Sequence, residues 1–325
     1  MFKRILVPLD GSPRAERALI VAARLARAGN GTVVLLSVVG IPPEYSSYAY
    51  GPYLAQPNVL GEEALAAKEA TAKEYVQGMR HCDKLAGVKV EAKVAVGPAA
   101  AAIQDIAGEE RIDLIVMCSR GDTGFKRWVL GSMAQRVSRV SEVPVLVLRE
   151  NGSAPDTAFP DPLRPLRSIM ALVALDGSQF AEAAILPTAL LVSALAAPAR
   201  GTLLLTRVVP LTTHDNTTAS KDAALDEAKT YLRQVSQKYE GQAANFAVSL
   251  NTTIATGKNV AETLIRAAEH GEEGESKRLT GNCDLIAVTT HGRGGLQRLA
   301  MGSVTEAMLG ATKLPLLVVH PPTNQ

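Results

Sequence analysis

Two stretches of the chain decide its fold: CSRGDTGFKRWVLGS at residues 118–132 and TTHGRGGLQRLAMGS at residues 289–303. Both contain spaced glycines and an arginine, both end in Gly-Ser, and each follows an apolar run, LIVM or LIAV. A strand, a glycine-rich turn and a helix start together favour a bound anion, because the helix dipole and free backbone N–H groups meet there. The repetition therefore predicts one nucleotide-binding type of domain that is built twice.

The repeat extends over most of the chain. ILVPLDGS at 5–12 matches LVALDGS at 172–178, and GTVVLLSVV at 31–39 matches GTLLLTRVV at 201–209. Because the offset between the two copies changes along the chain, it also locates insertions, which belong in surface loops.

The insertions lie at 40–60 in the first copy and at 270–281 in the second. Pro, Asp and Ser are frequent in the join at 151–165, a composition that is typical of linkers. We expect one domain at 1–150, a linker at 151–165 and a second domain at 166–325.

Short apolar runs alternate with helical stretches in each copy. In the first copy we expect strands near 4–9, 32–39, 88–96, 113–118 and 143–149. Runs of this kind are typical of parallel strands that are covered on both faces. The first helix is expected to have Ser12 as its N-cap, Pro13 at its first position and Gly29 just after its end. The pattern predicts an α/β fold with two doubly wound, Rossmann-like parallel sheets, each five-stranded, whose ligands bind at the carboxyl ends of the strands.

Composition narrows the class of protein. A net charge of +2 over 325 residues gives no case for nucleic acid as the main partner. The cysteines are Cys82, Cys118 and Cys283, and their wide spacing favours cytosolic thiols over disulfides or a zinc site.

The N-terminal apolar run stops before Asp10, which leaves no signal core. The uncharged stretch at 183–199 is shorter than a usual membrane span, so we expect a buried helix in a cytoplasmic protein without a membrane segment.

The spacing of small residues in both stretches suits a phosphate. Gly131 and Gly302 open the next helix without a Cβ, and the hydroxyls of Ser132 and Ser303 are then offered to a phosphate oxygen. A second reading stays open, because each serine also begins a capping box, Ser-x-x-Gln or Ser-x-x-Glu.

Asp10 and Asp176 end the first strand of each copy, directly before a Gly-Ser pair. One reading is an Asx-type turn that supports the following helix. The other is a carboxylate that orients ribose or adenine, or that helps to hold a metal ion on the phosphates. The sequence contains no GKS or GKT loop, no Ser-His-Asp order and no HExxH motif. An enzyme, such as a slow ATPase, is therefore the least favoured function.

These residues together resemble the universal stress protein family, here as a tandem two-domain member. The ATP-binding subgroup of that family has the pattern Gly-x2-Gly-x9-Gly followed by Ser or Thr. The matching positions are Gly121, Gly131 and Ser132 in the first copy and Gly292, Gly302 and Ser303 in the second. Cys118 and Thr289 stand where the pattern has its first glycine.

The resemblance implies a cytoplasmic domain with strand order 3-2-1-4-5 that binds ATP, with Mg²⁺ left open. Its adenosine contacts would be Pro8, Asp10 and the backbone at Val38 in the first copy, and Asp176 and the backbone at Val208 in the second. The phosphates would lie on the glycine loop and the serine. We expect a stress-response regulator whose nucleotide occupancy changes its shape or its affinity for an unknown protein partner. A nucleotide-free interaction module stays an alternative, because Cys118 and Thr289 depart from the pattern.

Family members also pair through their last strand. Here the corresponding runs are 143–149 and 314–320, and unpaired apolar edges promote aggregation. We expect the two runs to pair with each other as an intramolecular pseudo-dimer, with cover by a loop as the alternative, and a further homodimer is left open. The tyrosine-rich segment at 41–60 is a lid, a partner surface or an ordered loop. Cys118, beside the expected phosphate site, is an oxidation sensor or an inert thiol.

Overall fold

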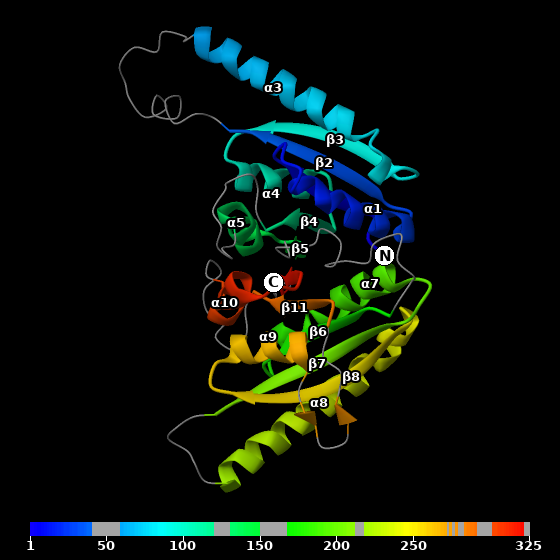
Figure 1. Cartoon of the computed structure of the whole chain (residues 1–325), viewed down its shortest axis with the longest axis vertical. Coiled ribbons are helices and arrows are strands. Elements are labelled where there is room, and N and C mark those ends of the chain that lie inside the picture. Colours follow the sequence, from blue (N-terminus) through cyan, green and yellow to red (C-terminus); the bar gives the residue numbers. More distant parts are fainter. Residues whose placement is uncertain are drawn as a thin grey trace, which may run out of the picture. The chain divides into compact units, whose positions relative to one another are not determined.

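A computed structural model describes residues 1–40, 59–119, 131–149, 168–211, 218–271, 273–274, 277–278, 283–290 and 301–321. The chain forms two compact units. The N-terminal unit comprises Phe2–Gly124 and Gly131–Val137, and the C-terminal unit consists mainly of Ser138–Gln325. In each unit helices pack against a central sheet, which confirms the predicted α/β fold class (Figure 1).

The N-terminal unit follows the predicted alternation of strands and helices. Its elements are β1 (Arg4–Leu9), η1 (Ala15–Arg17), α1 (Ala18–Gly29), β2 (Thr32–Val39), α3 (Val59–Met79), η3 (Asp83–Leu85), β3 (Lys89–Val96), α4 (Ala99–Glu109), β4 (Leu114–Cys118) and the first part of α5 (Ser132–Val140). The described strands are parallel in the order β3-β2-β1-β4. This order places the carboxyl ends of β1 and β4 side by side, at the switch point of a doubly wound sheet.

The first helix differs in detail from the prediction. The predicted start is a short 3-10 turn, η1, and the α-helix begins only at Ala18. Gly29 is the last helical residue, not the residue after the end, and Asn30 adopts the left-handed conformation at φ 47°. Asparagine tolerates this conformation better than most side chains do, so it takes the place that the prediction gave to glycine.

The C-terminal unit repeats the same plan and adds one strand. Its elements are β5 (Val145–Leu148), β6 (Met170–Leu175), α6 (Gln179–Glu182), α7 (Ile185–Ala196), β7 (Gly201–Pro210), α8 (Thr218–Asn245), β8 (Val248–Gly257), α9 (Val260–His270), β9 (Glu273–Gly274), β10 (Lys277–Arg278), β11 (Leu285–Thr289), α10 (Ser303–Ala311) and β12 (Leu316–Val319). The sheet order is β5-β12-β11-β6-β7-β8. From β12 to β8 the strands are parallel, and their order confirms 3-2-1-4-5 for the second copy.

The added strand, β5, is the last strand of the first copy. It pairs antiparallel with β12, with Leu317 opposite Leu146. The residues that follow both strands also reach across this pair: Arg149 donates from Nη2 to the carbonyl of Leu309 on α10, and Nε2 of His320 lies 3.3 Å from the carbonyl oxygen of Arg139 on α5. The prediction that the final strands of the two copies pair with each other is confirmed.

The uncharged stretch near residue 190 lies in α7. Among the described residues, one segment, Gln179–Ala196, is long and apolar enough to cross a membrane, but 61% of it is buried inside the protein. Ile185, Leu191 and Leu195 are fully buried, and α7 packs against β6 and β7. The segment is therefore the core helix that the sequence predicted.

Candidate functional site

The Asp-Gly-Ser turn after β1 has a defined geometry. Oδ1 of Asp10 accepts hydrogen bonds from the backbone N–H of Ser12 at 3.0 Å and from its hydroxyl at 2.6 Å. Gly11 has φ +84°, a left-handed conformation in which an L side chain would be strained. Oγ of Ser12 in turn accepts the N–H of Ala15 at 3.2 Å. The turn holds the Asp10 carboxylate at the carboxyl end of β1.

The second copy builds the same turn after β6. Oδ1 of Asp176 accepts the N–H of Ser178 at 2.9 Å and its hydroxyl at 2.6 Å, and Gly177 has φ +92°. The Asx-type turn predicted as one reading is therefore present in both copies. It uses Oδ1 of each aspartate, so the ligand reading depends on Oδ2 and remains a prediction.

The backbone of Val38 lies at the same edge of the sheet as the Asp10 turn. The carbonyl of Val39 accepts the N–H of Gly97 at 3.0 Å on the β3 side. Because the polar groups of consecutive strand residues alternate in direction, those of Val38 face the β1 side. There the β1–β2 register ends with Leu9 opposite Ser37. The carbonyl of Val38 therefore lies just beyond the last pair of that ladder.

Val208 repeats this arrangement. The N–H of Leu211 bonds the carbonyl of Gly257 at 3.0 Å on the β8 side, so by alternation Val208 faces the β6 side. The β6–β7 register ends with Leu175 opposite Arg207. In both copies the predicted adenosine contact is a backbone position next to the aspartate turn and past the last ladder pair.

The two ends of each glycine-rich loop are joined by one backbone hydrogen bond. The N–H of Gly131 donates to the carbonyl of Ser119 at 2.6 Å, and that of Gly302 donates to Thr290 at 2.7 Å. A Cβ at position 302 would lie 3.1 Å from the carbonyl oxygen of Thr290, which explains the glycine. The loops themselves, with the predicted residues Gly121 and Gly292, lie outside the described residues.

The capping-box reading of the two serines is wrong. Gly302 is the N-cap of α10, because the carbonyl of Gly302 accepts the N–H of Glu306 at 3.0 Å. Ser303 is therefore already the first helical residue, and the N-cap residue makes no side-chain hydrogen bond. The N–H of Gln135 likewise bonds the carbonyl of Gly131, one residue before Ser132. Both serines are exposed at the first position of their helices. Each serine therefore lies one position later in its helix than a capping box requires.

Cys118 and Thr289 end β4 and β11, where the family pattern has its first glycine. Neither is among the described residues with positive φ, so this position does not require glycine for its backbone conformation. The thiol of Cys118 lies 3.0 Å from the carbonyl oxygen of Arg14. The carbonyl of Thr289 accepts the hydroxyl of Thr305 at 2.7 Å. Both side chains fit the sheet edge without backbone strain.

Two tyrosines from the long helices approach the aspartate turns, and the sequence reasoning missed them. The hydroxyl of Tyr75 on α3 donates to Oε1 of Glu16 at 3.1 Å. Tyr231 on α8 lies near Glu182, whose carboxylate pairs with Lys238 at 2.7 Å. Burial raises the pKa of both phenols, and the neighbouring carboxylates raise it further. The matching AKEY at 72–75 and AKTY at 228–231 was the signal that would have identified them.

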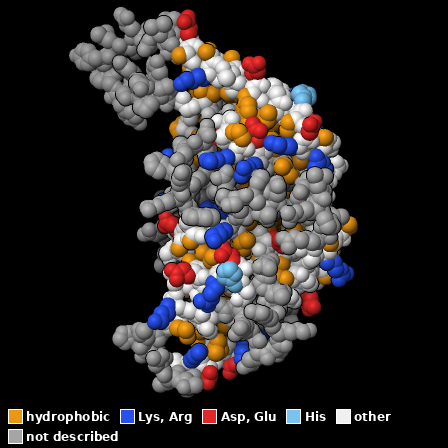
Figure 2. All heavy atoms as spheres, in the orientation of Figure 1, with side chains coloured by type: hydrophobic (Ala, Val, Ile, Leu, Met, Phe, Trp, Pro, Cys, Tyr) orange, Lys and Arg blue, Asp and Glu red, His pale blue; other side chains and the backbone are white. Residues whose placement is uncertain are grey.

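Other predicted features can be placed only in part. Pro8 lies in β1 opposite Leu36 and is half-buried. In the described residues no group of three or more His, Cys, Asp or Glu side chains is gathered as a metal site. The tyrosine-rich segment falls almost wholly outside the described ranges. On the visible described surface, Lys and Arg side chains lie among Asp and Glu without a large patch of one sign (Figure 2).

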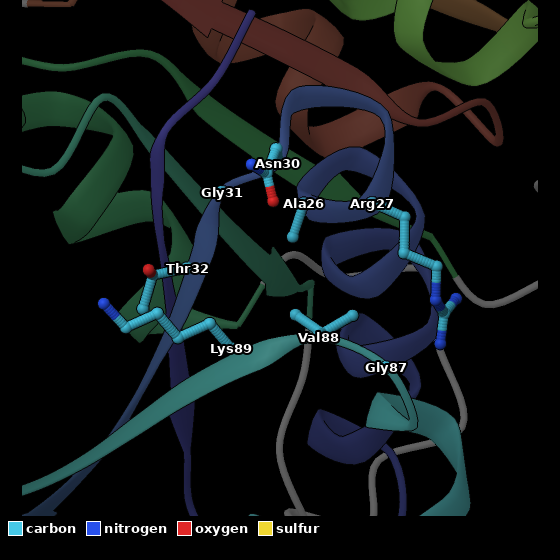
Figure 3. A pocket seen from close by; sticks show the side chains of 8 residues that line it. All are labelled: Ala26, Arg27, Asn30, Gly31, Thr32, Gly87, Val88 and Lys89. Carbon is cyan, nitrogen blue, oxygen red and sulfur yellow. The ribbon is translucent and has the colours of Figure 1, made fainter.

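A pocket of about 400 Å³ lies at the opposite edge of the N-terminal sheet, lined by Ala26, Arg27, Asn30, Gly31, Thr32, Gly87, Val88 and Lys89 (Figure 3). These residues come from the end of α1 and the beginnings of β2 and β3. The guanidinium of Arg27 donates to the carbonyls of Lys84 and Ala86, at 3.1 Å and 2.8 Å. The pocket is formed where α1 is tied to the turn before β3. It is separate from the carboxyl edge, where ligands of doubly wound sheets bind.

Comparison with known proteins gives a consistent result. The model of the universal stress protein family matches residues 1–149 and 170–320. A universal stress protein of Methanocaldococcus jannaschii is 31% identical over 153 residues, which is 46% of this chain and 84% of the relative. One from Bacillus subtilis is 31% identical over 152 residues, 46% of this chain and all of the relative. A solved universal stress protein from Archaeoglobus fulgidus covers 98% of both chains with a TM-score of 0.62 and 18% identity, a likeness of fold.

Proposed function

The chain belongs to the universal stress protein family, and on this premise we propose that it is a cytoplasmic regulator that binds ATP at the carboxyl edge of each sheet. Nucleotide occupancy would shift the protein between shapes with different affinity for a protein partner. Site 1 comprises Asp10, Val38 and the start of α5, and site 2 comprises Asp176, Val208 and the start of α10.

One observation carries this proposal: Gly302 occupies the N-cap position of α10, and Ser303 after it is the first helical residue. The N–H of Ser303 and its hydroxyl are therefore placed at the positive end of the α10 dipole. Gly302 keeps the helix start close to Thr290, so a phosphate would meet backbone, not a Cβ. Adenosine would lie along the same edge, with its ribose toward Asp176 and its base against the backbone of Val208 at the end of β7.

The chemistry that these residues supply is binding, not bond cleavage. Backbone N–H groups and the serine hydroxyl donate to phosphate oxygens, and the aspartate accepts from the ribose. Any Mg²⁺ would be carried mainly by the phosphates, since the described residues hold no cluster of metal ligands.

The test is to identify what the purified protein carries. The chain is denatured, its small-molecule extract is analysed by mass spectrometry, and thermal unfolding is followed with and without millimolar MgATP. We expect adenine nucleotide in the extract and a higher Tm with MgATP, because a ligand that binds only the folded state stabilises it.

A matched pair of variants locates the effect. Ser132→Ala combined with Ser303→Ala should weaken ATP binding about tenfold, the usual scale for a lost charge-assisted hydrogen bond. Ser138→Ala, a change of the same type at a buried position later in α5, should leave ATP binding unchanged. An extract without nucleotide, together with an unchanged Tm in millimolar MgATP, would reject ATP binding and favour a nucleotide-free interaction module.

A further inference from the structure

The two sites differ in one buried charge. Strand two of the first copy carries Ser37, and the matching position of the second copy is Arg207. Arg207 is 8% exposed and is the last β7 residue in the register with β6, opposite Leu175. It therefore lies between the turn that holds Asp176 and the backbone of Val208. A buried arginine at this point changes the charge of site 2 relative to site 1.

The guanidinium of Arg207 is held on the α8 side of the sheet. Its Nη2 donates to Oε1 of Glu227 at 2.8 Å, and its Cζ lies 5.3 Å from the centre of the Tyr231 ring. The Glu227 side chain is 67% exposed, whereas that of Arg207 is 9% exposed. An exposed carboxylate binds weakly in water, so it is readily exchanged for a stronger anion.

Tyr231 adds a second observation at the same place. Its hydroxyl is buried and has no hydrogen-bond partner in the structure. A buried hydroxyl without a partner is unfavourable and points to a missing one. The nearby carboxylate of Glu182 is compensated by Lys238 at 2.7 Å. Near Asp176, Tyr231 thus presents a buried hydroxyl without a partner beside the Arg207 cation, whose ion-pair partner is the exposed Glu227.

The dinucleotide-binding Rossmann motif suggests a ligand group for this arginine. In that motif an acidic residue binds the free ribose hydroxyl, and a nearby arginine accommodates a phosphate on the ribose. A guanidinium also matches a phosphate monoester bidentately, with better geometry than a point charge provides. The first copy has no such group, because Ser37 carries no charge.

We propose that Arg207, with the hydroxyl of Tyr231, makes site 2 selective for adenine nucleotides that carry a phosphate on the ribose, at the 2′ or the 3′ oxygen. The proposal rests on the adenine-nucleotide site described above and adds a specificity determinant to it. Site 1 binds nucleotides with an unmodified ribose and has no such preference.

The test compares three probes with the same base and the same 5′-phosphate: AMP, adenosine 2′,5′-bisphosphate and adenosine 3′,5′-bisphosphate. Binding is measured by calorimetry on the full chain with Asp10→Ala, which weakens site 1. We expect one of the bisphosphates to bind about tenfold tighter than AMP, and the identity of that bisphosphate assigns the phosphate position.

Variants at position 207 test the cause. Arg207→Ser, which installs the residue of the first copy, should abolish the preference and leave AMP affinity unchanged. Arg207→Lys should keep part of it, because the charge remains without the bidentate geometry. Thermal unfolding of each variant shows whether it is folded, and Ser37→Arg in a chain with Asp176→Ala is a second, independent variant that should gain the preference at site 1.

Each outcome has one meaning. Equal affinity for all three probes in the parent chain overturns the inference and leaves the proposed function intact. An equal loss of all three on Arg207→Ser also overturns it, since the residue then only supports the fold. If neither AMP nor ATP binds at any site, the proposed function fails and the inference fails with it.

Discussion

At the scale of single residues, each aspartate turn uses one carboxylate oxygen for its structure, and the proposed binding role falls to the other oxygen. Oδ1 of Asp10 and of Asp176 holds the turn, with serine contacts of 2.6 Å in both copies. The charge and the second oxygen are what a ribose would use. A substitution that keeps the acceptor oxygen of the aspartate but removes its charge therefore separates the two roles.

We predict that Asp176→Ala lowers both stability and nucleotide affinity, whereas Asp176→Asn lowers only the affinity. Alanine removes two hydrogen bonds that the turn needs, at a cost of about 1 kcal/mol in the free energy of unfolding. Asparagine keeps the acceptor oxygen and loses the charge. Denaturant unfolding and ATP titration of both variants check this. Equal ATP affinity of the asparagine variant and the parent would show that the turn is the only role of Asp176.

Residue-level prediction from sequence succeeded where the cause is local. The Asp-Gly-Ser turns and the glycine at position 302 follow from the spacing of neighbouring residues. Tyr75 and Glu16 are 59 positions apart, and Arg207 meets Tyr231 across 24 positions, so only the folded chain brings these pairs together. Only the capping-box reading placed the serines one position wrong, because a capping box and a glycine N-cap followed by serine have almost the same local sequence.

At the scale of elements, small residues decide how closely helices and strands approach. A Cβ added at Gly31, before β2, would lie 2.8 Å from the carbonyl oxygen of Phe2 and 2.9 Å from that of Lys3. Both atoms belong to the backbone, which cannot move away without disturbing β1. At the matching glycine of the second copy, Gly201, an added Cβ would collide with the side chain of Val192.

We predict that Gly31→Ala destabilises the N-terminal unit by about 1–3 kcal/mol, the usual cost of overpacking. Gly108→Ala, in α4, is the matched control, because a Cβ there meets nothing within 4 Å. It should raise stability by about 0.5–1 kcal/mol, since alanine restricts the unfolded chain. Thermal melts of the two variants should therefore shift in opposite directions.

A cluster of charges ties β1, β3 and the end of α4 together. Arg4 bonds Glu91 at 2.7 Å, and Glu110 pairs with both Arg4 and Lys93. The hydrogen bond from Arg4 lowers the pKa of Glu91, and that from Lys93 lowers the pKa of Glu110, each below the ordinary value of 4.5. Lowered folded-state values mean that the stabilisation is present above pH 4.5 and is lost as pH falls through them.

We predict that Arg4→Met costs about 1 kcal/mol at pH 7 and progressively less below pH 4.5. The variant loses ion pairs that the parent also loses once both carboxylates are protonated. Urea unfolding of both chains between pH 3 and 7 measures the difference. A gap that stays constant over this range would mean that Arg4 contributes through interactions that do not titrate, namely packing of its stem and the hydrogen bond from its Nε to the carbonyl of Glu110 at 2.6 Å.

Strand and helix positions were predictable because apolar runs and their spacing are local. The antiparallel β5–β12 pair was inferred from the need to cover two apolar edges. The exact starts of helices were less predictable: Pro13 was the predicted first position, but a 3-10 turn comes first and α1 begins only at Ala18. The charge cluster around Arg4 left no local signal, because its members come from three elements.

At the scale of the whole molecule, the β5–β12 pair makes the last strand of the first copy part of the sheet of the second. Val145, Leu146, Val147 and the facing residues of β12 are fully buried. β12 lies between β5 and β11 and has no open edge, unlike β3 and β8 at the ends of the described sheet orders.

We predict that hydrogen exchange is slow in both β5 and β12 and that the two strands lose protection together. Exchange in native conditions reports cooperative units, and paired strands open as one. The outer amides of β3 and β8 should exchange faster. Arg149→Ala, which removes the bond to α10, should speed exchange in β5 and β12 more than in β6. Rapid exchange of β5 alone would contradict the pairing.

The β5–β12 pair also has an evolutionary consequence. In a symmetric dimer of two identical chains, every substitution appears twice, and a change that helps one subunit must be tolerated by the other. Covalent duplication removes this requirement, so each half can accumulate its own mutations while the shared strand pair keeps them assembled. Ser37 and Arg207 are such a difference: matching positions of the two copies carry an uncharged and a charged side chain in one covalent molecule.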